Sequence, residues 1–106
     1  MKMITRMEEM IMLSVLNLGE QAYLVSIQKY LSELLEKKIS LTSIHLPLNR
    51  LEKYNYLAAN LLGATAVRGG RRKKIYHITK AGLEALNEYR TISDKLWNDH
   101  LGIGTS

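Results

Sequence analysis

The spacing of the hydrophobic residues changes once along this chain, and that change constrains the fold more than any other feature. In three successive segments apolar side chains recur every three or four residues, which predicts three amphipathic helices. These segments are residues 5–18, 22–36 and 41–54. From Tyr56 apolar and polar residues alternate instead, in two short runs separated by Gly69 and Gly70. Paired glycines accept the positive φ angles of a tight turn, so the two runs predict a β-hairpin.

The first helix is predicted to begin with a capping box. Thr5 and Glu8 have the S/T-x-x-E spacing in which a hydroxyl and a carboxylate satisfy the unpaired N–H groups of a helix start. Gly19 supplies the stop. Apolar residues cover more than one stripe of this helix: Met7, Met10, Met12, Ile11, Leu13, Val15, Leu16 and Leu18. A helix this apolar needs cover on several sides, so we expect it to form both the centre of the fold and part of a subunit contact.

The second and third helices are predicted to be amphipathic. Ile27, Leu31, Leu34 and Leu35 mark one face of the second, and Leu41, Ile44, Leu48 and Leu51 mark one face of the third. The opposite face of the third helix is mostly short and polar, and consists of Thr42, Ser43, His45, Leu46, Asn49 and Arg50. Such a face is suited to approaching a ligand rather than to packing.

Pro47 leaves two starts open for the third helix. Inside a helix a proline removes one hydrogen bond and clashes with the preceding turn, whereas in the first turn it costs nothing. The helix either begins at Leu41 with a disturbed first half, which we favour, or begins near His45. Asn55, which tolerates the left-handed conformation, is predicted to end it.

A fourth helix is predicted after the hairpin. Thr79 is its expected N-cap, and residues 102–106 read as a frayed tail. An apolar stripe recurs at helical spacing through Leu83, Leu86, Tyr89 or Arg90, Ile92, Leu96 and Trp97.

The excess of positive over negative charge is confined to the predicted hairpin. The chain has a net charge of +5, and residues 68–74 hold five of its fifteen Lys and Arg and no acidic residue. The remainder has ten basic and ten acidic residues and sums to zero. Concentrated positive charge attracts a polyanion, nucleic acid before anionic membrane. A solvated basic turn is the alternative, and the position of the cluster decides between them.

Length and composition exclude several classes of protein. A chain of 106 residues has room for one domain. It has no Cys, so it has neither a disulfide framework nor a thiolate metal site, and its three His lack metal-ligand spacing. No nucleophile elbow or phosphate-binding loop is present. No apolar run reaches the roughly 18 residues of a membrane span, and the first nine residues lack signal-peptide order. We expect a cytoplasmic protein that is not an enzyme, with no cofactor and no bound metal.

The order of elements predicts a mainly α fold with a small β-hairpin, namely a winged helix-turn-helix followed by a C-terminal helix. Residues 1–79 would form the DNA-binding domain and residues 80–106 the C-terminal helix, in a single compact unit. In this architecture the third helix enters the major groove and the wing lies along phosphates or in the minor groove. The predicted DNA-binding residues are Thr42, Ser43, His45, Asn49, Arg50, Arg68, Gly69, Gly70, Arg71, Arg72, Lys73 and Lys74.

Two stretches resemble the PadR family of bacterial transcriptional regulators. The first runs from Leu48-Asn49-Arg50-Leu51-Glu52-Lys53 to Tyr56-Leu57. The second, residues 68–83, resembles the family's R-G-G-R wing, its aromatic-bearing second strand and the T-x-x-G start of its C-terminal helix. The chain departs from the family at Leu24, where Gly usually follows the Tyr, at His45, where a longer Tyr is usual, and at Asn55, where Gly normally closes the helix.

The resemblance implies a homodimer joined through the first and last helices, of the short type with one helix after the wing, so residues 80–106 would be a C-terminal dimerisation helix. The expected interface residues are Met7, Ile11, Leu86, Ile92, Leu96 and Trp97. Trp97 has two readings: an anchor of the dimer contact, which we favour, or one wall of a pocket between subunits for a small flat hydrophobic effector, which some members of the family have.

The sequence thus predicts a homodimeric, sequence-specific transcriptional regulator, a repressor by family resemblance, that binds a pseudo-palindromic operator in double-stranded DNA. The alternative is a winged-helix protein-interaction module whose basic hairpin meets an acidic partner. Attachment to a membrane lacks support, because no helix has an amphipathic pattern with a cationic face.

Overall fold

A computed structural model describes residues 2–62 and 73–101 of the chain. Three helices come first: α1 (Arg6–Leu18), α2 (Leu24–Leu35) and α3 (Leu41–Lys53), with a short 3-10 turn η1 (Gly19–Gln21) after α1. Strands β1 (Leu57–Leu62) and β2 (Lys73–Ile78) follow, and α4 (Lys80–Leu101) closes the chain. The predicted fold class, mainly α with one antiparallel hairpin, is confirmed.

The helix ends follow the local chemistry of the sequence. Thr5 and Glu8 form the predicted capping box of α1, and Thr79 Oγ1 accepts the N–H of Gly82 at 2.9 Å at the start of α4. Ser40 caps α3, so this helix begins at Leu41 and continues through Pro47, which confirms the favoured start. Asn55 adopts φ 62° just beyond its end, as predicted.

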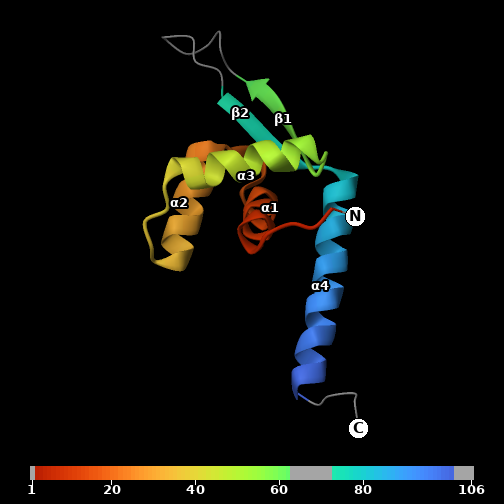
Figure 1. Cartoon of the computed structure of the whole chain (residues 1–106). Helices are drawn as coiled ribbons and strands as arrows, with labels where there is room; N and C mark the ends of the chain where they lie inside the picture. The colour runs from red at the N-terminus through yellow and green to blue at the C-terminus, as the bar shows by residue number, and fades with distance from the viewer. Residues whose placement is uncertain (1, 63–72, 102–106) are drawn as a thin grey trace.

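One hydrophobic core joins the three helices to the hairpin. Figure 1 shows α1 end-on at the centre, with α2 beside it and α3 crossing in front of the hairpin. The core residues of α1 are Ile11, Met12 and Val15, and they meet Ile27 and Leu31 of α2, Ile44, Leu48 and Leu51 of α3, and Leu57 and Tyr76 of the hairpin. Helical spacing overestimated burial at helix ends, because Leu34 and Leu41 are exposed.

The hairpin is held against the helices along one edge and one face. Its register pairs Leu57 with Ile78 and Ala59 with Tyr76. The Tyr76 N–H donates to the carbonyl oxygen of Ala22 at 2.8 Å, which ties β2 to the segment before α2. The Tyr76 ring is buried, as expected for a packing aromatic, and His77 is exposed.

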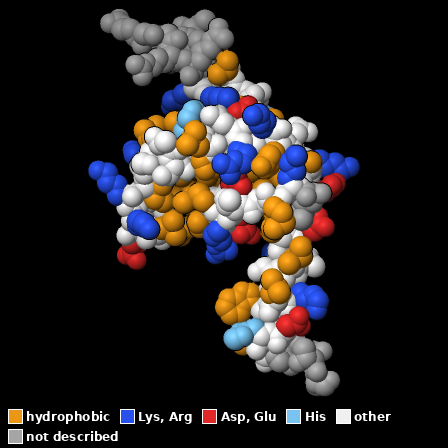
Figure 2. All heavy atoms as spheres, viewed as in Figure 1, with side chains coloured by type: hydrophobic (Ala, Val, Ile, Leu, Met, Phe, Trp, Pro, Cys, Tyr) orange, Lys and Arg blue, Asp and Glu red, His pale blue; other side chains and the backbone are white. Residues whose placement is uncertain are grey.

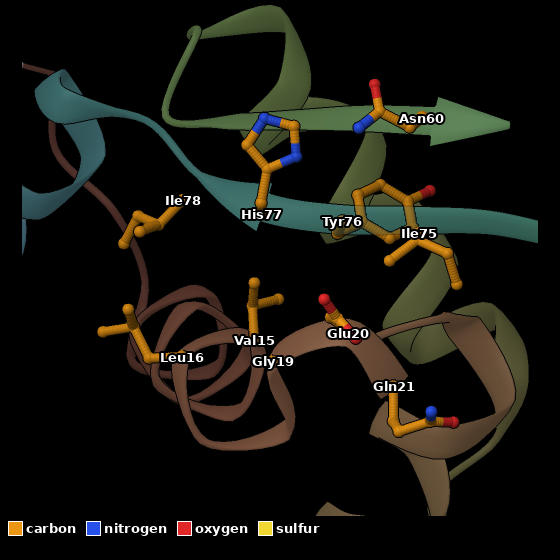
Figure 3. Close-up of a pocket in the computed structure, with 10 residues that line it drawn as sticks. All are labelled: Val15, Leu16, Gly19, Glu20, Gln21, Asn60, Ile75, Tyr76, His77 and Ile78. Atoms are coloured by element: carbon orange, nitrogen blue, oxygen red, sulfur yellow. The ribbon is translucent and has the colours of Figure 1, made fainter. Parts of the chain in front are cut away.

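The hairpin also borders a groove of about 730 Å³. Figure 3 shows this groove between the end of α1 with η1 and the two strands. Val15 and Leu16 line the helical side, and Asn60, Ile75 and His77 line the strand side.

Only the first part of α4 packs on the body. Ala85 and Leu86 enter the core, and the Tyr89 hydroxyl accepts the Ile4 N–H at 2.6 Å. Residues 90–101 are all exposed and extend away from the body, which gives the chain dimensions of 64 × 30 × 20 Å (Figure 1). In Figure 2 apolar side chains lie along this extension.

The residues predicted for a dimer contact therefore fall into two groups. Ile11 and Leu86 lie in the chain's own core, and Met7 is half-buried against it. Ile92, Leu96 and Trp97 are exposed on α4. The wide apolar face of α1 is thus covered largely from within the chain.

Candidate nucleic-acid interface

The outward face of α3 is defined by its buried side. Ile44, Leu48 and Leu51 are fully buried. Because successive residues of an α-helix are rotated by about 100°, the stripe opposite these three contains Thr42, Leu46, Asn49 and Lys53, all of which are exposed. Arg50 and Ser43 lie at one edge of this stripe and His45 and Glu52 at the other. All five predicted contact residues of α3 are exposed.

Hydrogen bonds within α3 order some of these polar groups. Asn49 Nδ2 lies 3.2 Å from His45 Nε2, one helical turn away. The Ser43 hydroxyl lies 2.8 Å from that of Ser40, which caps the helix. The amide oxygen of Asn49 keeps its capacity to accept a hydrogen bond from a base edge.

Arg50 makes a contact to another helix. Its Nη1 donates to Oε2 of Glu8 on α1 at 3.0 Å. The Glu8 side chain is 1% exposed and the Arg50 side chain 48%. The sequence explained Glu8 as a capping residue, and the structure adds this ion pair.

The two described cations of the hairpin also contact the helical body. Lys74 Nζ lies 2.7 Å from Oε1 of Glu52, at the edge of α3. The hydrogen bond with Glu52 raises the pKa of Lys74, and partial burial of the ammonium opposes this shift. Lys73 Nζ lies 4.3 Å from the ring centre of Tyr23 in a cation–π contact. Both lysines therefore join the start of β2 to the helical body.

The remaining predicted wing residues lie outside the described part of the chain: Arg68, Gly69, Gly70, Arg71 and Arg72. The strands that carry this segment lie beside α3, because Glu52 and Lys74 bridge them (Figure 1).

Sequence reasoning missed Lys53 as a member of the outward stripe. A signal was present, because Lys53 follows Asn49 by four residues and therefore lies on the same side of the helix. A shallow hollow on this surface is lined by Leu46, Asn49, Arg50, Glu52 and Lys53.

The described residues contain no group of three or more His, Cys, Asp or Glu that could hold a metal ion. Within residues 2–62 and 73–101, no helix combines the length and the hydropathy that a membrane crossing requires.

These features define a winged helix-turn-helix protein with an exposed polar third helix. Comparison with solved structures agrees. The chain is similar to a PadR-like transcription factor from Bacteroides fragilis, with a TM-score of 0.74 and 22% identity over 92% of this chain and 89% of that one. It is also similar to a PadR family transcriptional regulator from Eggerthella lenta, with a TM-score of 0.69 and 27% identity over 92% and 81% of the two chains.

A third similar structure is a PadR-like transcriptional regulator from Bacillus cereus, with a TM-score of 0.65 and 26% identity over 90% of each chain. No protein-family model and no curated protein matches the chain. The resemblance to the PadR family is confirmed, and the chain has the PadR-like winged-helix fold. The family is one of transcriptional regulators rather than enzymes, in agreement with the sequence analysis.

Proposed function

We propose that this chain is a transcriptional regulator that binds double-stranded DNA through α3 and the basic wing. One observation carries the proposal: the Glu52–Lys74 ion pair joins the start of β2, next to the basic segment, to the edge of an α3 whose outward side is exposed and mostly polar. A helix of this kind fits the major groove, and cations beside it meet the phosphates that border the groove. The PadR-like fold supports the same function.

The proposal extends to a homodimer that acts as a repressor in the cytoplasm. Two copies of α3, related by a two-fold axis and about one duplex turn apart, would bind a pseudo-palindromic operator. The exposed apolar residues Ile92, Leu96 and Trp97 supply a surface for the second copy. Met7, in the first turn of α1, would adjoin this contact.

The proposed contacts are of two kinds: contacts to base edges, which determine sequence preference, and contacts to phosphates, which determine affinity. Asn49 and Thr42, on the outward stripe, would touch base edges, with Ser43 and His45 beside them. Arg68, Arg71 and Arg72 would bind phosphates, and Gly69 and Gly70 would let the wing approach the backbone closely. With three arginines from each wing, a dimer should show a slope of log affinity against log salt of about −5.

A small hydrophobic effector has a candidate location on α4. Ser93, Leu96, Trp97 and His100 line a hollow of about 370 Å³ on its exposed part. In a dimer this hollow would lie between the subunits. Trp97 is the only tryptophan, so its fluorescence would report a flat aromatic compound that binds there and releases operator DNA.

The test is selection of bound duplexes from a random pool at stated ionic strength, followed by binding measurements on variants. Arg71→Ala combined with Arg72→Ala should weaken binding to every sequence, whereas Asn49→Ala should change the preference among sequences. Arg90→Ala combined with Lys95→Ala removes the same charge from the exposed part of α4 and is the matched control.

Two results would contradict the proposal. If Arg71→Ala combined with Arg72→Ala left the DNA affinity unchanged, the wing would not contribute to binding. A wild-type protein that binds all duplexes equally, with a Kd of roughly 10⁻⁴ to 10⁻⁶ M at physiological salt, would favour the interaction module with an acidic partner instead.

A further inference from the structure

Glu8 is buried more completely than helix capping requires. Its side chain is 1% exposed, and acidic side chains are rarely buried so fully unless they are paired. Oε1 accepts the Thr5 N–H at 2.7 Å, which completes the capping box. A glutamine at this position caps equally well, so the cap does not need the negative charge. The charge is used by the second oxygen, Oε2, which accepts from Arg50.

Arg50 is only partly occupied by this contact. The guanidinium carries five N–H donors in a planar fork, and its side chain remains 48% exposed while Nη1 bonds to Glu8. A guanidinium that is held on one side and open on the other can present a fixed pair of donors to a second anion. The Glu8 contact determines where those donors lie.

The position of Arg50 on α3 indicates which anion it meets. The outward stripe runs through Thr42, Asn49 and Lys53, and Arg50 lies at its edge, on the side of α1. The major groove is about 12 Å wide and a helix with its side chains is about 10–12 Å across. The edges of a helix in the groove therefore face its two phosphate walls, and the stripe between them faces the bases.

We propose that Glu8 is a positioning residue that holds Arg50 so that its exposed N–H groups bind one defined phosphodiester of the DNA backbone in each half-site. The proposal rests on the proposed function, and adds a buried residue on α1 to the interface. A phosphate contact of this kind sets the register of α3 along the groove.

The gain lies in placement rather than in total attraction. A free arginine loses much rotamer freedom when it is immobilised, and the Glu8 contact removes part of that loss before DNA arrives. The same carboxylate repels the phosphate, so overall affinity is an ambiguous measure. A better measure is which individual phosphate affects the affinity when it is neutralised, because the position of that phosphate does not depend on the net charge of the protein.

The experiment scans the tightest duplex selected by the wild-type protein, replacing one phosphate at a time with a neutral methylphosphonate. In the wild type, one phosphate per half-site beside α3, separate from those that the wing arginines bind, should cost about tenfold in affinity when neutralised, as expected for a charged hydrogen bond. Arg50→Ala should abolish that sensitivity. Glu8→Gln keeps the cap and the side-chain volume, and should reduce the sensitivity several-fold by releasing the guanidinium.

Glu9→Gln is the matched control. Glu9 lies in the same turn of α1 and pairs with Arg6, so the variant removes an equal charge without touching Arg50. It should retain the wild-type phosphate profile. The double variant Glu8→Gln with Arg50→Ala should match Arg50→Ala alone, because Glu8 acts through Arg50. Thermal melting of each variant separates these effects from loss of folding.

The outcomes are distinct. A Glu8→Gln profile identical to that of Glu9→Gln would show that Glu8 only joins α1 to α3, and would overturn the positioning role while the proposed function stands. A phosphate profile unchanged in Arg50→Ala would exclude Arg50 as the contact. A wild-type protein that selects no sequence from the pool would overturn the proposed function and this inference together.

Discussion

The carboxylate of Glu52 on α3 and the ammonium of Lys74 on β2 lie 2.7 Å apart. The pair connects the helix that presents the polar face to the strand that follows Arg71 and Arg72, across 22 positions of sequence. It also has a cost for DNA binding, because a carboxylate at the edge of α3 occupies one cation of the hairpin. The ion pair therefore reduces the attraction of Lys74 for DNA and fixes the position of β2 relative to α3.

Glu52→Gln should increase affinity for all duplexes. Release of Lys74 would let it neutralise a phosphate, which steepens the salt dependence by about 0.9 per subunit. The free energy of unfolding should change by less than about 1 kcal/mol, because both partners are partly exposed. Binding isotherms at several salt concentrations measure the slope. Glu88→Gln, on the exposed side of α4, removes an equal charge; equal slopes in the two variants would contradict the role of Lys74.

Gly82 should tolerate no side chain. It is buried at the start of α4, where an added Cβ would meet the carbonyl oxygen of Tyr56 and approach the Ile78 side chain within 2.9 Å. Because the obstacle is backbone, Gly82→Ala should destabilise the fold by about 2 kcal/mol and lower Tm by about 10 °C. Asn87→Ala, exposed on the same helix, should change stability by less than about 0.5 kcal/mol. A Gly82→Ala variant that melts with the wild type would disprove the close contact.

The local parts of this fold could be predicted from the sequence because their causes are local. The Thr5–Glu8 box and the Thr79–Gly82 cap each span four residues, and Asn55 ends α3 through its own φ angle. The contact between Glu8 and Arg50 spans 42 positions, and no pattern at short range reports it. The outward face of α3 could also be predicted from local sequence, because the rotation of about 100° per residue determines which side chains share one side of a helix.

The apolar patterns did not distinguish side chains buried within the chain from side chains available for contact with a second subunit. The broad face of α1 was assigned partly to a subunit contact, yet Ile11 is fully buried beneath the chain's own helices and hairpin. The stripe of α4 continues through Leu86 to Leu96 without a change of spacing, although the first is buried and the second is exposed. Only the three-dimensional path of α4, which extends away from the body, separates the two cases.

Stability should fall in alkaline solution above about pH 10. Burial raises the pKa of Tyr76 above its usual value of 10.0, partly opposed by Lys74, and the Glu52 hydrogen bond raises the pKa of Lys74 above 10.5. The folded chain therefore holds both protons more tightly than the unfolded chain does. This contribution is complete below pH 10 and is lost as pH rises through the folded pKa values.

Tyr76→Phe removes one of these two groups and should make the alkaline loss of stability shallower. Chemical denaturation between pH 8 and about pH 11 measures the difference. Tyr54→Phe makes the same chemical change at a half-buried ring and is the control. If the free energy of unfolding of Tyr76→Phe falls with pH as steeply as that of the wild type, the tyrosine does not contribute to the loss of stability at alkaline pH.

The exposed half of α4 should determine whether the protein associates with itself. Leu96 and Trp97 are 64% and 63% exposed, so their truncation removes little from the core of the chain. Leu96→Ala combined with Trp97→Ala should weaken a dimer by at least about 3 kcal/mol, or roughly a hundredfold in Kd, because buried aromatic side chains dominate interface energies. Analytical ultracentrifugation over a concentration series measures the shift, and the melting temperature of the dilute monomer should stay close to that of the wild type.

Asn98→Ala lies in the same turn and should leave self-association unchanged, since it removes a polar group from an exposed site. The double variant should also bind a two-half-site duplex with the affinity of one half-site, because the second α3 is no longer tethered to the first. A wild-type protein that sediments as a monomer at tens of micromolar, or a double variant as dimeric as the wild type, would show that the apolar surface of α4 serves another partner.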